Sequence, residues 1–317
     1  MTSSTWRTGF RNATLFMICL LFSLIAGCEF FPLAAAKEAS IAQTSLTDIE
    51  KKIRDRYDPI ARYSYSEYEA LLACLDDEKF EVVSLLDMNV TEDPSKVIVG
   101  LRHDVDRHPF KAVEMALMEK KHGFGASYYI LPNAYYAGAY VDGQYQRYQE
   151  MGEVYQRISS QGMEIGIHND LLTMQLSRDI DPVGFNAKTV EYFQSLGIAT
   201  VGSVAHGSPL MRQLALTNYY VFSDFVDLDP QKRRKITWND GTYELGTKSM
   251  AEFGFQYEAN FVNKNVYISD AGGNWKYTVA DTLFKGVDTV KIIEVLRNSI
   301  PGDRIQILTH PVWWGKS

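Results

Sequence analysis

Short apolar runs alternate with longer amphipathic segments from about residue 80 to residue 310. The runs hold four to six residues rich in Val, Ile and Ala, which is typical of buried strands, and several of the longer segments begin at Pro and end at Gly, which is typical of helices. We expect strands at residues 80–85, 97–101, 126–131, 163–167, 200–205, 219–222 and 304–308, and helices at residues 67–77, 109–122, 144–160, 182–196, 209–217 and 287–298, with a further helix opening at residue 47. This order predicts a parallel sheet in an α/β protein, and about seven such units can close into a barrel.

Residues 235–275 break this alternation and predict a β-rich insertion near the C-terminal third. Asn239-Asp240-Gly241 provides a hairpin turn inside it. The length of about 270 residues from 47 to 317 suits a single domain.

The first residues predict export. Arg7 and Arg11 precede an apolar stretch at 13–27, which is too short for a comfortable membrane span and is followed by Cys28. The order of apolar residues, small residues and Cys resembles a bacterial lipobox, so residues 1–27 are read as a lipoprotein signal peptide. Cys28 would then carry lipid and attach the chain to a membrane of the cell envelope, with residues 28–46 as a flexible tether; cleavage within residues 32–36 is the alternative. Cys74 would be a lone core cysteine.

Charge excludes one class of partner. The whole chain has a net charge of −7, and without residues 1–27 it carries 30 basic and 39 acidic side chains. This balance argues against a nucleic-acid partner.

Charged and imidazole side chains follow the apolar strands at their carboxyl ends. Strand 97–101 leads into His103, Asp104 and Asp106, and the two carboxylates share one face because side chains alternate along a strand. The chain has six His, and four stand at this kind of position: His103, His168, His206 and His310. The carboxyl edge of a parallel sheet is where α/β proteins build their sites, so these groups predict a metal or acid–base site. His108 and His122 are read as the first and last residues of a helix.

Mixed carboxylate and imidazole ligands suit Zn²⁺ or another first-row divalent ion. Such an ion lowers the pKa of a water, a carboxylate can take the water's proton, and a His can protonate the leaving group. The sequence contains no Gly-x-Ser-x-Gly elbow, phosphate loop or Gly-rich dinucleotide fingerprint.

Five motifs together resemble the polysaccharide deacetylase superfamily, the carbohydrate esterase family four group, in its Arg-His-Asp-Val-Asp branch. They are LRHDVD (101–106), GMEIGIHND (162–170), AHGSP (205–209), YISDAGGNW (267–275) and ILTHPVWW (307–314), and the resemblance covers roughly residues 60–315. It implies a distorted (β/α)7 barrel and metal-dependent removal of an acetyl group from an N-acetylated sugar.

By this resemblance Asp104 matches the catalytic base, while Asp106 and His168 match metal ligands. The family's two Asp are adjacent, whereas Val105 separates them here, so the two roles can be exchanged. The family's second metal His falls on Leu172, which leaves the third ligand to His206, our choice, or to Asp170.

The same resemblance assigns His310 as the catalytic acid, with Asp270 and Trp275 as residues that orient it; a turn Asp and a core Trp are the alternative. Arg102 is grouped with the orienting or substrate-binding residues. Further aromatic side chains are candidates for stacking on a sugar or for simple packing: Trp313, Trp314, Tyr135, Tyr136 and Tyr140.

The predicted function is a zinc-dependent deacetylase of a cell-surface or extracellular polysaccharide. Leu172 favours an alternative, a glycan-binding lipoprotein without catalysis. A metal-dependent hydrolase of another amide or ester is the third possibility.

Overall fold

The computed structural model describes residues 45–226 and 234–316, which fall in one compact unit. The predicted signal peptide, Cys28 and most of the tether lie outside the described residues. No helix in the described ranges is long and apolar enough to cross a membrane.

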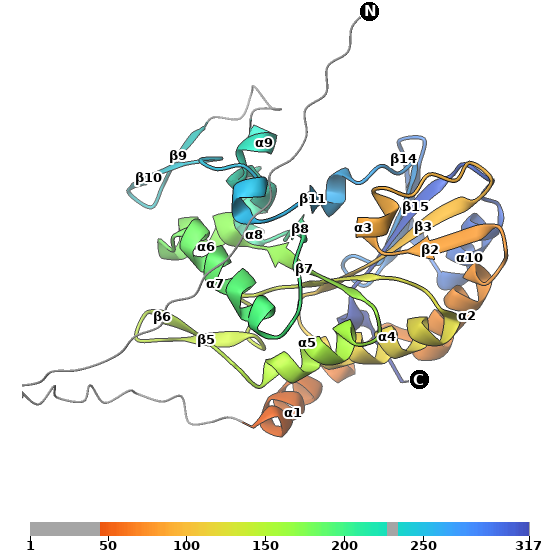
Figure 1. Ribbon diagram of the computed structural model, residues 1–317, viewed down its shortest axis with the longest axis horizontal. Helices are drawn as coiled ribbons and strands as arrows, with labels where there is room; N and C mark the ends of the chain where they lie inside the picture. Colours follow the sequence, from red (N-terminus) through yellow and green to blue (C-terminus); the bar gives the residue numbers. More distant parts are fainter. Residues whose placement is uncertain (1–44, 227–233, 317) are drawn as a thin grey trace, which may run out of the picture. The chain divides into compact units, whose positions relative to one another are not determined.

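A mostly parallel sheet forms the centre of the molecule (Figure 1). Its strands lie in the order β11 (Tyr257–Glu258), β8 (Gly202–Ala205), β7 (Glu164–Asn169), β4 (Ser127–Ile130), β3 (Val97–Val105), β15 (Arg304–Thr309), β12 (Val266–Ser269), β13 (Trp275–Val279) and β14 (Thr282–Val287), and β2 (Phe80–Val83) pairs with the first half of β3. Only the β12–β13 and β13–β14 pairs of this sheet are antiparallel. The α/β class is therefore confirmed. A closed barrel is not seen, because no ladder among the described residues joins β11 to β14.

Helices connect the parallel strands. They are α1 (Leu46–Tyr57), α2 (Tyr65–Leu75), α3 (Leu85–Met88), α4 (Pro109–His122), α5 (Met151–Ser159), α6 (Leu171–Arg178), α7 (Pro182–Ser195), α8 (Pro209–Gln213), α9 (Ser223–Val226) and α10 (Thr289–Arg297). α4 packs beside α5, and α2 packs against both α4 and α10 (Figure 1). Local signals explain the helix ends: Ser64 and Glu67 form a capping box at α2, and α4 begins at Pro109 and ends before Gly123 in the left-handed conformation.

The two faces of β3 carry different side chains. Val97, Val99 and Leu101 belong to the large core shared with the helices, whereas Ile98 belongs to a small separate cluster with Leu85 and Met88 of α3. A Cβ on Gly100 would lie 2.4 Å from the Met88 sulfur, so a glycine is needed where α3 packs against this face. Because Arg102 and Asp104 continue that face toward the carboxyl end, it changes from apolar to charged along the strand.

The helix predicted at 144–160 is only partly right. Its first four residues form the strand β6 (Gln144–Arg147) instead. β6 pairs with β5 (Gly138–Val141) in a hairpin that is closed by Asp142 and Gly143, at φ 49° and 77°. An Asp-Gly pair at positive φ is a strong hairpin signal, and it outweighs the helical spacing here.

The structure differs from the sequence prediction in two further places and agrees with it in another. The strand predicted at 219–222 is the short 3-10 helix η2 (Asn218–Val221), and α6 was not predicted. The hairpin predicted at 239–241 is confirmed by β9 (Lys235–Trp238) and β10 (Gly241–Glu244), with Asn239 and Asp240 at positive φ. The remaining short elements are η1 (Asp58–Ile60), β1 (Tyr63–Ser64), η3 (Ala251–Phe253), η4 (Ala259–Phe261), η5 (Pro311–Trp313) and β16 (Trp314–Gly315).

Candidate metal centre and acid–base groups

The carboxyl ends of four strands supply polar side chains to one cavity of about 460 Å³. Six of the sequence-predicted residues line it: Asp104 in β3, Asp106 directly after β3, His168 in β7, His206 after β8, and His310 and Trp313 after β15. Parallel strands place their carboxyl ends at one edge of a sheet, which is why residues up to 206 positions apart in the chain meet here.

Asp106, His168 and His206 form a candidate metal-binding triad, because their ligand atoms all lie within 4.8 Å of one another. The Oδ1 atom of Asp106 is 3.0 Å from His168 Nε2, yet it is buried and makes no hydrogen bond. Burial alone would raise the pKa of Asp106, but His168, His310 and His206 together outweigh burial and hold that pKa well below its usual range. An ionised, buried carboxylate oxygen beside two imidazole rings is a suitable ligand for a cation.

Neighbouring groups orient both imidazole rings of the triad. His168 Nδ1 donates to the Val204 carbonyl at 3.1 Å, and His206 Nδ1 lies 3.1 Å from Asp170 Oδ1. Each ring therefore directs its Nε2 toward the triad, the arrangement in which protein imidazoles bind metals. Two nitrogens and one carboxylate oxygen form a donor set that fits Zn²⁺ or a similar ion.

Asp170 lies behind His206 and is not in the triad. Its carboxylate also accepts hydrogen bonds from Asn133 Nδ2 at 2.8 Å and Asn218 Nδ2 at 3.0 Å, so it serves as a support. Burial lowers the pKa of His206, but Asp170, Asp106 and Asp104 together outweigh burial and the net shift is upward. Of the two candidates for the third ligand, the geometry thus favours His206. Leu172 is fully buried.

Asp104 is held by a two-point ion pair within the same cavity. Arg102 donates to both carboxylate oxygens, from Nε at 2.8 Å and from Nη2 at 2.7 Å, and both side chains are buried. Burial would raise the pKa of Asp104, but Arg102, His168 and His310 together outweigh it and the net shift is downward. Asp104 also lies 3.6 Å from His168 Nε2, so an ionised carboxylate stands directly beside the triad.

His310 faces the cavity from β15 with a carboxylate behind it. Its Nδ1 lies 2.6 Å from Asp270 Oδ1, and Asp270 also accepts a hydrogen bond from the Trp314 indole at 2.9 Å. Burial opposes the charged ring, but Asp270, with smaller contributions from Asp106 and Asp104, outweighs burial and raises the pKa of His310 to about 9. His310 is therefore protonated near neutral pH, as a proton donor must be.

The aromatic candidates separate by burial. Trp313 lines the cavity, whereas Trp314 is fully buried and cannot stack on a sugar; it holds Asp270 instead. Trp275 is also fully buried, and its indole donates to Thr289 Oγ1 at 3.2 Å, so the Trp beside Asp270 is Trp314 and not Trp275.

The tyrosines do not line this cavity. Tyr136 is buried and donates to the Val105 carbonyl, Tyr135 is exposed, and Tyr140 lies on β5.

The fourth strand-end histidine, His103, does not join the site. It faces the helices, stacks on Tyr128 at a ring separation of 4.2 Å, and lies 2.6 Å from Glu119 Oε1. Strand alternation explains this, since His103 stands between two residues that face the other way. His108 and His122 lie at the start and end of α4 as expected.

Glu258 was not singled out from the sequence. It is the last residue of β11 and is buried. Its carboxylate accepts hydrogen bonds from the Ala205 backbone N–H and from Asn260 Nδ2. Asn260 in turn accepts a hydrogen bond from Arg102. Burial raises the pKa of Glu258 to about 7. It thus connects the strand end before His206 to the Arg102–Asp104 pair. No motif marks it, because the signal is a pairing between distant segments.

No family model matches the chain, and no curated protein matches it either. The functional argument therefore depends on the residues of this cavity.

Proposed function

We propose that the chain is a metal-dependent deacetylase that removes acetyl groups from an N-acetylated polysaccharide. One observation carries the proposal: a single cavity contains the Asp106–His168–His206 triad, an ionised carboxylate and a protonated imidazole. Hydrolysis of an amide needs these three parts, because the carbonyl must be polarised, the water deprotonated and the leaving amine protonated.

We also propose that the sheet curls into the distorted (β/α)7 barrel that the sequence resemblance implies. Two side-chain hydrogen bonds support it by linking the middle of the sheet to the segment directly after β11. Gln306 of β15 donates to the Ala259 carbonyl at 3.0 Å, and Arg102 of β3 donates to Asn260 at 3.0 Å. Such contacts require the β11 end of the sheet to bend over the β3–β15 centre.

In this proposal Asp106, His168 and His206 hold a divalent ion, with Zn²⁺ the best match to the donors. When bound, the ion supplies Lewis acidity to the amide carbonyl and to water. Asp104 accepts the proton of the attacking water, and the two hydrogen bonds from Arg102 keep it ionised and fixed for that task.

His310 completes the reaction from another strand end. Water adds its oxygen to the acetyl carbon, the C–N bond breaks, and the amine nitrogen takes a proton from His310, so that acetate and a free amine leave. Asp270 holds the ring in place and favours its protonated form. Trp313, beside His310 in the cavity, offers an apolar surface to a sugar ring. Export and attachment through lipid on Cys28 would place this activity in the cell envelope.

Acetate release tests the proposal. Purified protein supplied with Zn²⁺ should release acetate from at least one of chitooligosaccharides, peptidoglycan and secreted polysaccharide, and Asp104→Asn should abolish the release while keeping the metal. Lys121→Gln, on α4, is the matched control and should change nothing.

Two outcomes of this experiment would exclude deacetylation as the function. Binding of glycan with no metal and no acetate release would favour the glycan-binding alternative, which Leu172 at the family's second His position suggests. Metal-dependent cleavage of other amides or esters alone would assign a different hydrolase.

A further inference from the structure

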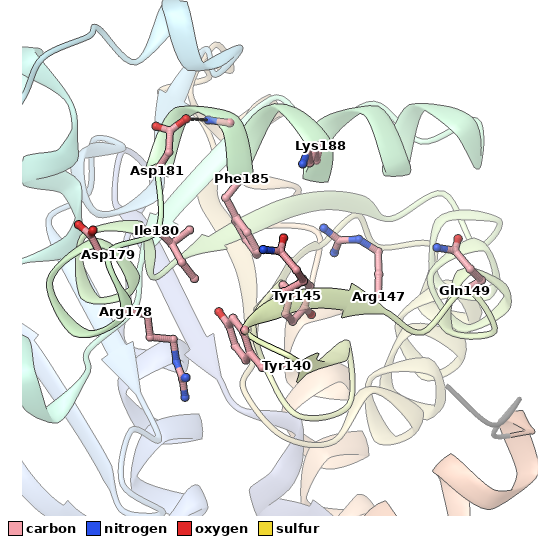
Figure 2. A pocket seen from close by; sticks show the side chains of 13 residues that line it. Tyr140, Tyr145, Arg147, Gln149, Arg178, Asp179, Ile180, Asp181, Phe185 and Lys188 are labelled. Atoms are coloured by element: carbon pink, nitrogen blue, oxygen red, sulfur yellow. Dashed lines mark hydrogen bonds between the residues drawn. The ribbon is translucent and has the colours of Figure 1, made fainter. Parts of the chain in front are cut away.

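A second and larger cavity lies away from the triad and shares no lining residue with it. Its volume is about 570 Å³. Figure 2 shows the β5–β6 hairpin with Tyr140, Tyr145 and Arg147 on one side, and α7 with Phe185 and Lys188 on the other. Arg178, the last residue of α6, lines the same cavity.

Three cations line this cavity without a carboxylate partner. Among the described residues, no carboxylate oxygen lies within 4.0 Å of the charged nitrogens of Arg147, Arg178 or Lys188. Two acids, Asp179 and Asp181, also line it, and Asp181 is engaged at the start of α7, where it accepts from Gly184 N at 2.9 Å. Three unpaired cations against two acids, in a chain with net charge −7, indicate an anionic ligand.

Both arginines are positioned before any ligand arrives. Arg147 donates to Thr189 Oγ1 at 3.0 Å and lies 4.8 Å from the centre of the Tyr192 ring. Arg178 lies 4.3 Å from the centre of the Tyr140 ring. A guanidinium held in this way loses little conformational freedom on binding and presents a planar fork that matches a carboxylate.

The other lining groups suit a sugar better than a bare ion. The rings of Tyr140, Tyr145 and Phe185 supply apolar surface, and the buried Tyr140 hydroxyl has no hydrogen-bond partner. A pyranose ring presents apolar C–H faces and hydroxyl groups, so it can use both the rings and this hydroxyl.

α6 connects the two cavities along the chain. Asp170, which supports His206, directly precedes this helix, and Arg178 is its last residue. Eight helical residues span about 12 Å, a distance that a short oligosaccharide can bridge. The β5–β6 hairpin and α6 also follow the carboxyl ends of β4 and β7, the edge of the sheet that carries the triad.

We infer that this cavity binds an acidic sugar unit of the same polymer whose neighbouring N-acetyl group reaches the triad cavity. The inference rests on the proposed function for its substrate, and it names the substrate class as an anionic polysaccharide with uronate-type carboxylates.

Isothermal titration calorimetry with hexagalacturonate, chitohexaose and inorganic phosphate tests the inference. Hexagalacturonate should bind in a salt-sensitive manner and at least tenfold more tightly than either of the other probes. Arg178→Gln and Arg147→Gln should each weaken it at least tenfold, whereas Arg157→Gln, an exposed arginine on α5, should not. Arg178 is exposed, so its variant should fold even if the half-buried Arg147 variant does not.

Three outcomes would overturn the inference: equal binding of chitohexaose, equal binding of phosphate, or an unchanged affinity in Arg178→Gln. The two proposals fail separately. Arginine-dependent binding without acetate release removes only the deacetylase, and acetate release without such binding removes only the anionic site.

Discussion

His103 and Asp104 are neighbours in β3, yet they belong to polar clusters of opposite character. On the helix side, His103 Nδ1 lies 2.6 Å from Thr309 Oγ1 and its Nε2 2.6 Å from Glu119, which also accepts from Tyr68 and Tyr128. His103 Nε2 makes no hydrogen bond, but each polar group there still faces another polar group inside the protein.

On the cavity side, ligand atoms of Asp106, His168 and His206 lie within 4.8 Å of one another, and the three residues line an open cavity. A cluster whose polar groups face one another inside the protein stabilises the fold, whereas one whose ligand atoms converge on a cavity is suited to bind something. Both clusters lie at the carboxyl end of β3, so the position along the strand does not distinguish them. The face of the strand on which each side chain lies does.

The largest expected effect is the loss of metal on the cavity side. His168→Ala removes one of three ligands, so we expect zinc content to fall and acetate release to drop by on the order of 10³-fold or more. The free energy of unfolding of the metal-free protein should change far less. Elemental analysis with acetate assays checks this, and full zinc content in the variant would show that the triad is not the metal site.

The helix side should behave in the opposite way. His103→Ala leaves Glu119 buried without its imidazole partner, which is expected to cost about 3–5 kcal/mol of unfolding free energy. Urea denaturation of metal-free protein measures this loss. Folded protein should retain its zinc, and selective zinc loss would erase the distinction between the two sides.

Elements of the fold could be predicted from the sequence wherever a short local pattern determines the structure. The strand that carries Asp104 and Asp106, the helix ends at Pro109 and Gly123, and the hairpin at Asn239-Asp240 were all predictable. So was the meeting of His168, His206 and His310, because the carboxyl ends of parallel strands lie at one edge.

Other features depend on contacts that no local pattern contains. The partner that separates His103 from the site is Glu119, 16 residues later on a packed helix. Trp314, rather than Trp275, reaches Asp270 because the chain turns back after His310. Helix α6 has only a short apolar pattern, and the helical spacing after Asp142-Gly143 predicts a helix from residue 144 where the structure has the strand β6.

The smallest expected effect concerns the pH range of the cavity side. His310 has its pKa raised to about 9 by Asp270, and as a proton donor it must be protonated, so activity should fall as pH rises through about 9. Asp270→Asn removes the charge, so this alkaline limb should move down by at least about one pH unit. The same raised pKa gives a stabilising contribution that is complete below the unfolded value of 6.5 and is lost as pH rises toward 9.

A pH–rate profile of kcat/KM compares the variant with Glu69→Gln as its control. Glu69 raises the pKa of His122 in the same manner, but that pair lies on α2 and α4 and does not line the cavity. The control should therefore leave the limb in place. If both variants shift it equally, the limb reports general stability, because only the cavity-side pair can act on the leaving group. If neither shifts it, His310 is not the proton donor, and the cavity side holds a metal triad and a base whose acid lies elsewhere.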